Sequence, residues 1–193
     1  CITGLHIGSK EDPAKKRNIS DGFFGNVAGA NIRNLAIDAK IYAISDGAYM
    51  VGALAGTARE SRLDRIDVTA TIVAETTHRK SNLFVGGIVG SGMKQEIYNC
   101  TANVDLRSTA VGGTAEAGGI VGITNRGIVA NCRSTGKIGG STDRVQEEGM
   151  TAFGGIAGVN GGTIVNTYSC MDIVSDSYTH YVGAVVGWAT GIA

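Results

Sequence analysis

The sequence predicts an all-β fold, a parallel β-helix of about five to six turns with three short strands in each turn. A glycine pattern and the apolar stretches behind it predict this fold. The pattern reads glycine, any residue, an aliphatic residue, alanine or valine, glycine. Its six copies occupy 25–29, 52–56, 86–90, 118–122, 154–158 and 183–187. The first glycines lie 27 to 36 residues apart, a period typical of solenoids.

Two apolar stretches follow each glycine pattern and complete the turn. The first reads aliphatic, any residue, usually Asn, then a small or apolar residue, at 32–35, 63–66, 97–100, 129–132 and 164–167. The second is a short alternating run, at 37–41, 68–72, 102–104 and 171–174. Segments of three to six residues broken by glycine are strands rather than helices. We expect each strand to pair in parallel with its equivalent one turn along, in a right-handed coil.

The recurring glycine, asparagine and cysteine positions have structural explanations. Glycine suits tight corners that need a left-handed residue or a close approach without a Cβ. We expect an amide ladder at a turn, formed by Asn34, Asn99, Asn131 and Asn166. Cys100 and Cys132 follow two of these residues and should stack as small buried groups, with a disulfide between them as the alternative. No carboxylates recur beside the asparagines and no Cys-x-x-Cys occurs, so we expect neither a metal site nor another cofactor.

Composition narrows the classes of partner. The 193 residues fit one repeat domain over 1–193, with 17 basic and 17 acidic side chains and 6% aromatic residues. Balanced charge and few aromatics argue against nucleic-acid binding. No apolar stretch is long enough for a membrane span. The chain opens at Cys1 without a signal region, so Cys1 is either a lipid anchor or the point at which a piece of a larger protein begins.

The repeat resembles the GLUG repeat of bacterial surface proteins. The resemblance rests on Gly-Gly-Ile-Val-Gly at 86–90 and 118–122, followed by Ile97-Tyr98-Asn99-Cys100-Thr101 or by 129–136. The opening residues 2–7 and 22–25 resemble the segment that precedes the first such repeat. The likeness covers nearly the whole chain. It is specific for the repeat type and unspecific for function.

The resemblance implies a module of a large bacterial protein, secreted or at the cell surface. Such repeats are found in immunoglobulin-A-type metallopeptidases and adhesin-like proteins. The chain has no His-Glu-x-x-His, so we do not expect peptidase activity in it. The expectation is a non-catalytic structural or presentation module. Two alternatives stay open: a binding module for host glycan or protein, and an accessory domain that positions substrate for an enzyme in a neighbouring domain of the same polypeptide.

Candidate binding residues lie in insertions at one place of the repeat, between the third strand and the next glycine pattern. The insertions span 74–81, 108–116, 141–149 and 175–180. Insertions that share a repeat position gather on one face of a solenoid, which is often its binding face. The candidates are His78, Arg79, Arg144, Glu147, Glu148, Tyr178 and His180. Simple solvated loops are the alternative. No pair of carboxylates or nucleophile with a base converges in the sequence, so no catalytic residue is expected.

Overall fold

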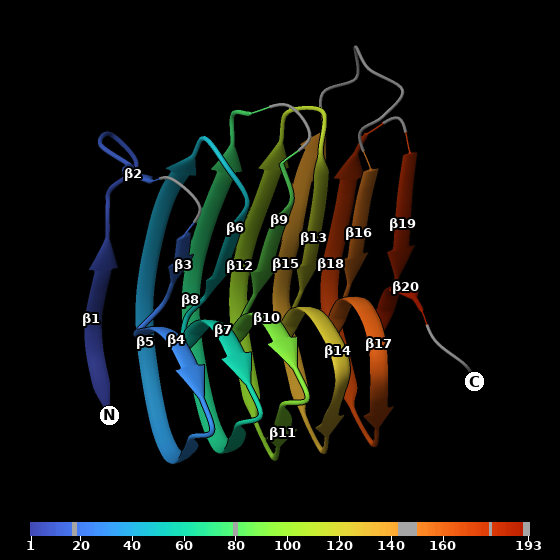
Figure 1. The fold of residues 1–193 in the computed structure, drawn as a ribbon. Helices are drawn as coiled ribbons and strands as arrows, with labels where there is room; N and C mark the ends of the chain where they lie inside the picture. The colour runs from blue at the N-terminus through green and yellow to red at the C-terminus, as the bar shows by residue number, and fades with distance from the viewer. Residues whose placement is uncertain (17–18, 79–80, 143–149, 178, 191–193) are drawn as a thin grey trace.

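The chain forms a β-solenoid of about five turns, as the sequence predicts (Figure 1). This computed structural model describes residues 1–16, 19–78, 81–142, 150–177 and 179–190. The described residues contain twenty strands and no helix. Every strand pairing among them is parallel and joins a strand to its equivalent one turn along. The repeat therefore builds the fold by stacking identical turns.

One complete turn consists of β6 (Tyr49–Gly52), β7 (Ala55–Arg59) and β8 (Arg62–Thr76). The first of these belongs to a six-stranded sheet. Its members are β3 (Ile19–Asp21), β6, β9 (Leu83–Gly86), β13 (Thr114–Gly118), β16 (Met150–Gly154) and β19 (Thr179–Gly183). The second, after a glycine turn, is a return strand. The return strands are β4 (Phe24–Ala28), β7, β10 (Val89–Met93), the first parts of β14 (Val121–Ala130) and β17 (Ala157–Val165), and β20 (Val186–Ala189).

The third strand of each turn is longer than the other two. The long strands are β5 (Asn31–Ser45), β8, β12 (Thr101–Ala110), β15 (Arg133–Thr142) and β18 (Tyr168–Asp176). The short β11 (Glu96–Tyr98) precedes β12, while β1 (Ile2–Ile7) and β2 (Ala14–Lys16) pair with β5. The nine to fifteen residues of a long strand exceed the predicted three to six. The alternation of apolar and polar residues continues beyond the short apolar run, so the strand continues with it.

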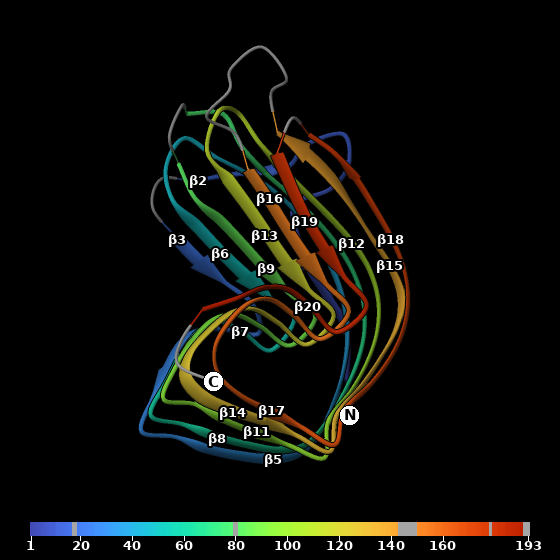
Figure 2. The same cartoon turned by 90° about the vertical axis from the view of Figure 1, so that its right-hand side faces the viewer.

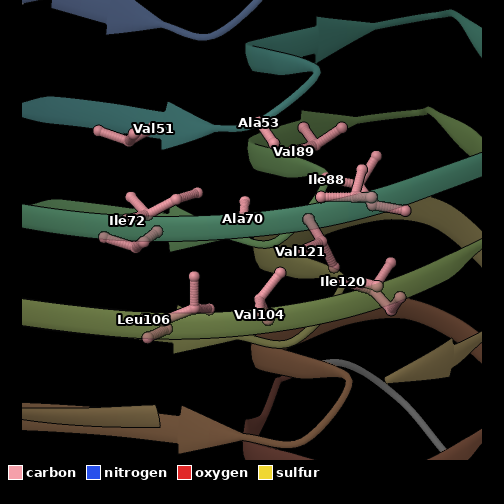
Figure 3. Close-up of a cluster of buried hydrophobic side chains, with 14 of the residues drawn as sticks. Val51, Ala53, Ala70, Ile72, Ile88, Val89, Val104, Leu106, Ile120 and Val121 are labelled. Atoms are coloured by element: carbon pink, nitrogen blue, oxygen red, sulfur yellow. The ribbon is translucent and has the colours of Figure 1, made fainter. Parts of the chain in front are cut away.

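Seen along the axis, the turns enclose two lobes (Figure 2). The six-stranded sheet and the long strands face each other across one lobe, and the return strands close the other. Equivalent apolar residues stack in columns inside (Figure 3). One column contains Ile41, Ile72, Leu106 and Ile138, all at most 1% exposed. Burial that repeats in every turn makes the core continuous through the described chain.

The glycine pattern marks the turn between the six-stranded sheet and the return strands. A Cβ on Gly86 would lie 1.8 Å from the carbonyl oxygen of Val89, so close approach rather than left-handed backbone requires this glycine. The first predicted copy of the pattern, at 25–29, begins three residues later than the glycine turn of the structure. Register pairs Asp21 with Val51 and Phe24 with Ala55, so Gly22 rather than Gly25 is the equivalent of Gly52. The glycine turn of the first turn is one residue shorter than the others, so its sequence does not match the five-residue pattern.

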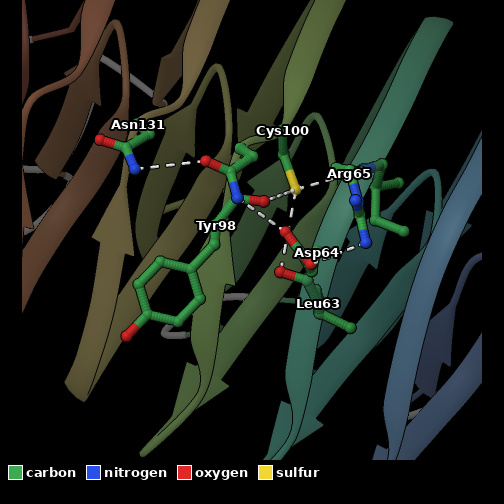
Figure 4. A network of polar contacts seen from close by, with 8 residues as sticks. Leu63, Asp64, Arg65, Tyr98, Cys100 and Asn131 are labelled. Atoms are coloured by element: carbon green, nitrogen blue, oxygen red, sulfur yellow. Dashed lines mark hydrogen bonds and ion pairs between the residues drawn. The ribbon is translucent and has the colours of Figure 1, made fainter.

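Left-handed residues occupy a second corner, which lies within β5 and β8 and just before β12, β15 and β18. Asn34, Arg65, Asn99, Asn131 and Asn166 all have φ between 49° and 57°. Three of the four asparagines of the predicted amide ladder, Asn99, Asn131 and Asn166, form it here. Asn166 Nδ2 donates to Asn131 Oδ1 at 2.7 Å. Asn131 Nδ2 donates in turn to Asn99 Oδ1 at 3.2 Å (Figure 4). Arg65 interrupts the column, so Asn99 Nδ2 donates to Asp64 Oδ1 instead, at 2.7 Å.

Arg65→Asn should stabilise the protein by about 0.5–1 kcal/mol, because asparagine tolerates the left-handed region better than arginine does. The substitution also extends the column from Asn34 to Asn166. The ion pair it removes, Arg65 to Asp64 at 3.5 Å, is largely exposed on the arginine side and contributes little. Urea unfolding measures the change. Asn131→Val, which places a β-branched residue at φ 55°, should lower stability by at least about 1 kcal/mol. An unchanged or lower stability of R65N would contradict this explanation.

Candidate binding surfaces

The loops that join the long strands to the six-stranded sheet gather at one edge of the solenoid (Figures 1 and 2). The predicted insertions at 74–81, 108–116 and 175–180 overlap described residues of these loops, whereas that at 141–149 lies outside the described residues from 143 on. The strands nevertheless take more of each insertion than predicted. β8 continues to Thr76, β12 to Ala110, β15 to Thr142 and β18 to Asp176. The loops between the long strands and the six-stranded sheet are correspondingly shorter than the sequence indicated.

Two of the seven predicted binding residues lie in the part of the chain that the structure describes. His78 is exposed, and its Nδ1 lies 3.4 Å from Ser81 Oγ. His180 is exposed on β19, with Nδ1 3.5 Å from the carbonyl oxygen of Ser177. β13 and β16 separate β19 from β9, the strand that follows His78. Strands lie about 4.8 Å apart, so the two histidines do not share a site. Arg79, Arg144, Glu147, Glu148 and Tyr178 lie outside the described residues.

The outer face of the long strands carries grooves that sequence reasoning did not single out as a site. We call this surface the broad face, the outward side chains of β5, β8, β12, β15 and β18. Its largest groove has a volume of about 500 Å³ and is lined by residues that include Asp38, Asp67, Asn103 and Arg133. Three further grooves of about 350–390 Å³ lie along the same face. All are shallow because a sheet surface forms their floor.

Polar side chains repeat in register across the broad face. One column contains Asp38, Thr69, Asn103 and Thr135, and Thr135 Oγ1 donates to Asn103 Oδ1 at 3.3 Å. The next contains Lys40, Thr71, Asp105, Lys137 and Asp172. Asp38, Lys40, Thr69, Thr71, Asn103 and Asp172 are polar positions of the alternating runs at 37–41, 68–72, 102–104 and 171–174. The alternating pattern of Thr69 and Thr71 was the signal for them, although it predicts a solvated face rather than grooves.

Glu116 is the most unusual charged residue that the structure describes. It lies in β13, between Phe84 and Ala152 of the neighbouring strands, and is only 6% exposed. Its Oε2 has no hydrogen-bond partner. Burial raises the pKa of the Glu116 carboxyl to about 7.

The fold explains why an outward position is buried. Register places Glu116 in the column of Ala152 and Tyr181. The Tyr181 ring stacks on Trp188 of the return strand β20, with ring centroids 5.5 Å apart. The return strands therefore cover the outer face of the six-stranded sheet. Ile123 occupies the equivalent of Trp188 in the turn of Glu116, so the environment of the carboxyl is apolar.

Cys100 and Cys132 stack inside the corner, as predicted, and both are buried free thiols. The thiol of Cys100 donates to the carbonyl oxygen of Tyr98 at 3.0 Å, and that of Cys132 to the carbonyl oxygen of Ala130 at 3.2 Å. The neighbouring Cys132 thiol and burial together raise the pKa of the Cys100 thiol. A protonated, buried thiol is a poor nucleophile. The pair therefore acts in packing, and the alternative of a disulfide is not adopted.

Neither metal clusters nor membrane helices occur in the described part of the chain. No group of three or more His, Cys, Asp or Glu side chains there is placed to hold a metal ion. No described helix is long and apolar enough to cross a membrane. No family model, curated protein or solved structure matches the chain. The resemblance to the GLUG repeat therefore remains a prediction that depends on the residues quoted for it.

Proposed function

We propose that the chain is a non-catalytic structural and presentation module of a large bacterial protein, secreted or at the cell surface. One observation carries the proposal. In-register parallel pairing links every turn to the next, from β1 to β20. Continuous ladders over a continuous core make a stiff rod, and the loops gather along one of its edges. A rod with loops on one edge suits the display of short segments away from a support.

The proposal predicts that a displayed loop can change without loss of the fold. An epitope of about ten residues inserted between Gly47 and Ala48, in the loop after β5, should lower the free energy of unfolding by no more than about 1 kcal/mol, since loop closure entropy grows slowly with length. The matched control inserts the same peptide between Gly87 and Ile88 in a glycine turn, and it should prevent folding. Circular dichroism and antibody binding measure both outcomes.

Two results would contradict this function. The first is unfolding by the insertion after Gly47, since a presentation module must tolerate change at that edge. The second is hydrolysis or elimination of a glycan or peptide substrate by the purified chain, because the module is proposed to be non-catalytic. A broad substrate screen on the unmodified chain tests the second, with a heat-unfolded sample as the blank.

The grooves of the broad face favour one second candidate, the binding of an extended glycan. Polar side chains that repeat every turn offer donors and acceptors about 4.8 Å apart along the rod. Asn103 and Thr135 lie within the largest groove. Asn103→Lys should then abolish retention on a glycan array, whereas replacement of 175–180 by Gly/Ser should not. Retention that depends on 175–180 instead would place binding on the loop edge.

A further inference from the structure

Large hydrophobic side chains are exposed at the two ends of the solenoid. Phe23 and Phe24 lie in the first turn and are 37% and 36% exposed. The last turn and its neighbour carry the others, Val165, Tyr168, Val174, Tyr181, Val182, Val185 and Trp188. Among the described residues, Met93 on β10 is the exception, away from both ends. Monomeric proteins seldom concentrate apolar side chains in this way without a partner.

The exposed residues of the last turn continue columns that are buried in earlier turns. Val182 is the register equivalent of Phe153, which is 0% exposed. Val185 occupies the place of Ile156 in the glycine pattern, and Ile156 is also 0% exposed. These side chains become a core when another turn of the same cross-section covers them. The chemistry that fits this end is therefore another solenoid turn.

Both ends also present strands that are paired on one side only. β18, β19 and β20 form the edges of the last turn, and β1, β3 and β4 form those of the first. Open edges of parallel strands are templates for further strands. The edges correspond. β18 and β1 each pair with a long strand, β19 and β3 belong to the six-stranded sheet, and β20 and β4 are return strands.

Charge favours the same arrangement. His6 pairs with Lys40 at the head of a column that ends in Asp172. A second molecule stacked on the last turn would place its His6, with Lys40 behind it, beside the exposed carboxylate of Asp172. Phe23 and Phe24 of that molecule would lie in the columns of the glycine turn that hold Val185 and its neighbour Val186.

We propose that copies of this chain associate head to tail, the first turn of one on the last turn of the next. In this contact β1, β3 and β4 add to β18, β19 and β20 and extend both sheets. Each copy uses two different faces, so the association is heterologous and does not close into a symmetric dimer. Linear oligomers that lengthen with protein concentration are the expected product. This inference does not depend on the function proposed above.

Variants that block one face each test the proposal. Phe24→Lys blocks the first turn, and Val185→Lys blocks the last turn. Met93→Lys is the matched control, because it adds the same charge at a similarly exposed hydrophobic residue between the ends. Sedimentation velocity over roughly 1–200 µM should show growing oligomers for the wild type and M93K. Each face variant should weaken self-association at least about tenfold, a change of about 1.4 kcal/mol. Circular dichroism verifies that all variants fold.

Mixing the two face variants gives the sharpest result. F24K retains its last turn and V185K retains its first turn, so a mixture should form one-to-one dimers and nothing longer. A wild-type chain that remains monomeric at the highest concentration would overturn the proposal and leave a flanking segment of a longer polypeptide to cover these faces. Oligomers that persist equally in F24K and V185K, or a mixture that fails to dimerise, would also overturn it.

Discussion

Replacing Glu116 with glutamine should raise the free energy of unfolding by about 3 kcal/mol at pH 8.5 and change it little at pH 4. The carboxyl is 6% exposed, its Oε2 has no partner, and burial raises its pKa to about 7 from 4.5. A pKa that differs by one between the folded and the unfolded chain corresponds to about 1.4 kcal/mol of stability. Glutamine has nearly the same shape and stays neutral, so it removes the cost of ionisation.

The sign of the pH dependence follows from the raised pKa. Below about pH 4.5 the carboxyl is protonated in both the folded and the unfolded chain, so it costs nothing. Between pH 4.5 and 7 the unfolded chain loses the proton first, so the contribution of Glu116 to stability falls as pH rises. Above pH 7 the penalty is complete and constant. Stability measured against pH should therefore fall through this window in the wild type and fall less in E116Q.

Chemical unfolding at several pH values between 4 and 9 measures this difference. Glu75→Gln is the control, since Glu75 lies half-buried on the broad face and should change stability by less than about 0.5 kcal/mol at every pH. Equal effects of E116Q at pH 4 and pH 8.5 would show that folding does not change the pKa of Glu116, and would contradict this explanation. Hydrogen exchange of β13 and β14 should also be slower in E116Q at high pH.

The burial of Glu116 illustrates what the sequence could not predict. In Thr114-Ala115-Glu116-Ala117 the glutamate occupies the polar position of an alternating strand, which normally faces solvent. The glycine turn after β13 folds the return strand over this face. This is a tertiary contact, and the alternation of residues within one strand cannot predict it. Ile123, the register equivalent of Trp188, lies on the next strand of the same turn.

The repeat could be predicted from the sequence because nearly every turn contains the same glycine pattern and the same asparagine. The glycine pattern predicts the turn at Gly86 and Gly118, and the recurring asparagines predict the ladder from Asn99 to Asn166. Prediction was wrong where one turn departs from the others. Gly25 matches the pattern by chance in a turn that is one residue shorter, and Arg65 occupies an asparagine position. The grooves of the broad face were the least predictable feature, because loop composition says nothing about the surface of a sheet.

Gly118→Ala should destabilise the protein more than any of the other substitutions considered, by about 4 kcal/mol or more. An added Cβ would lie 2.0 Å from the carbonyl oxygen of Val121 and 2.7 Å from both the Cα of Ala157 and the carbonyl oxygen of Ile156. All three neighbours are backbone atoms, so no rotamer change relieves the overlap. The turn itself has to move, and with it the return strand that covers the six-stranded sheet.

The position of Gly118 in the middle of the solenoid spreads the loss of stability to the neighbouring turns. Its strand pairs with β9 on one side and with β16 on the other. Displacement of one turn therefore weakens two interfaces, and in a solenoid these nearest-neighbour interfaces supply much of the stability. We expect G118A either to unfold entirely at room temperature or to unfold at a much lower urea concentration than the wild type, as measured by circular dichroism.

Gly139→Ala separates this steric explanation from a general effect of replacing glycine in strands. Gly139 lies on the broad face, and the nearest atom to an added Cβ is the carbonyl oxygen of Val174 at 3.9 Å, an ordinary contact. Alanine there reduces the entropy of the unfolded chain and should stabilise by about 0.4–1 kcal/mol. If close approach at the glycine turn is the cause, G139A should raise the free energy of unfolding and G118A should lower it. Equal destabilisation in both would instead indicate that the strands require glycine for backbone freedom, and the turn would then have no special role.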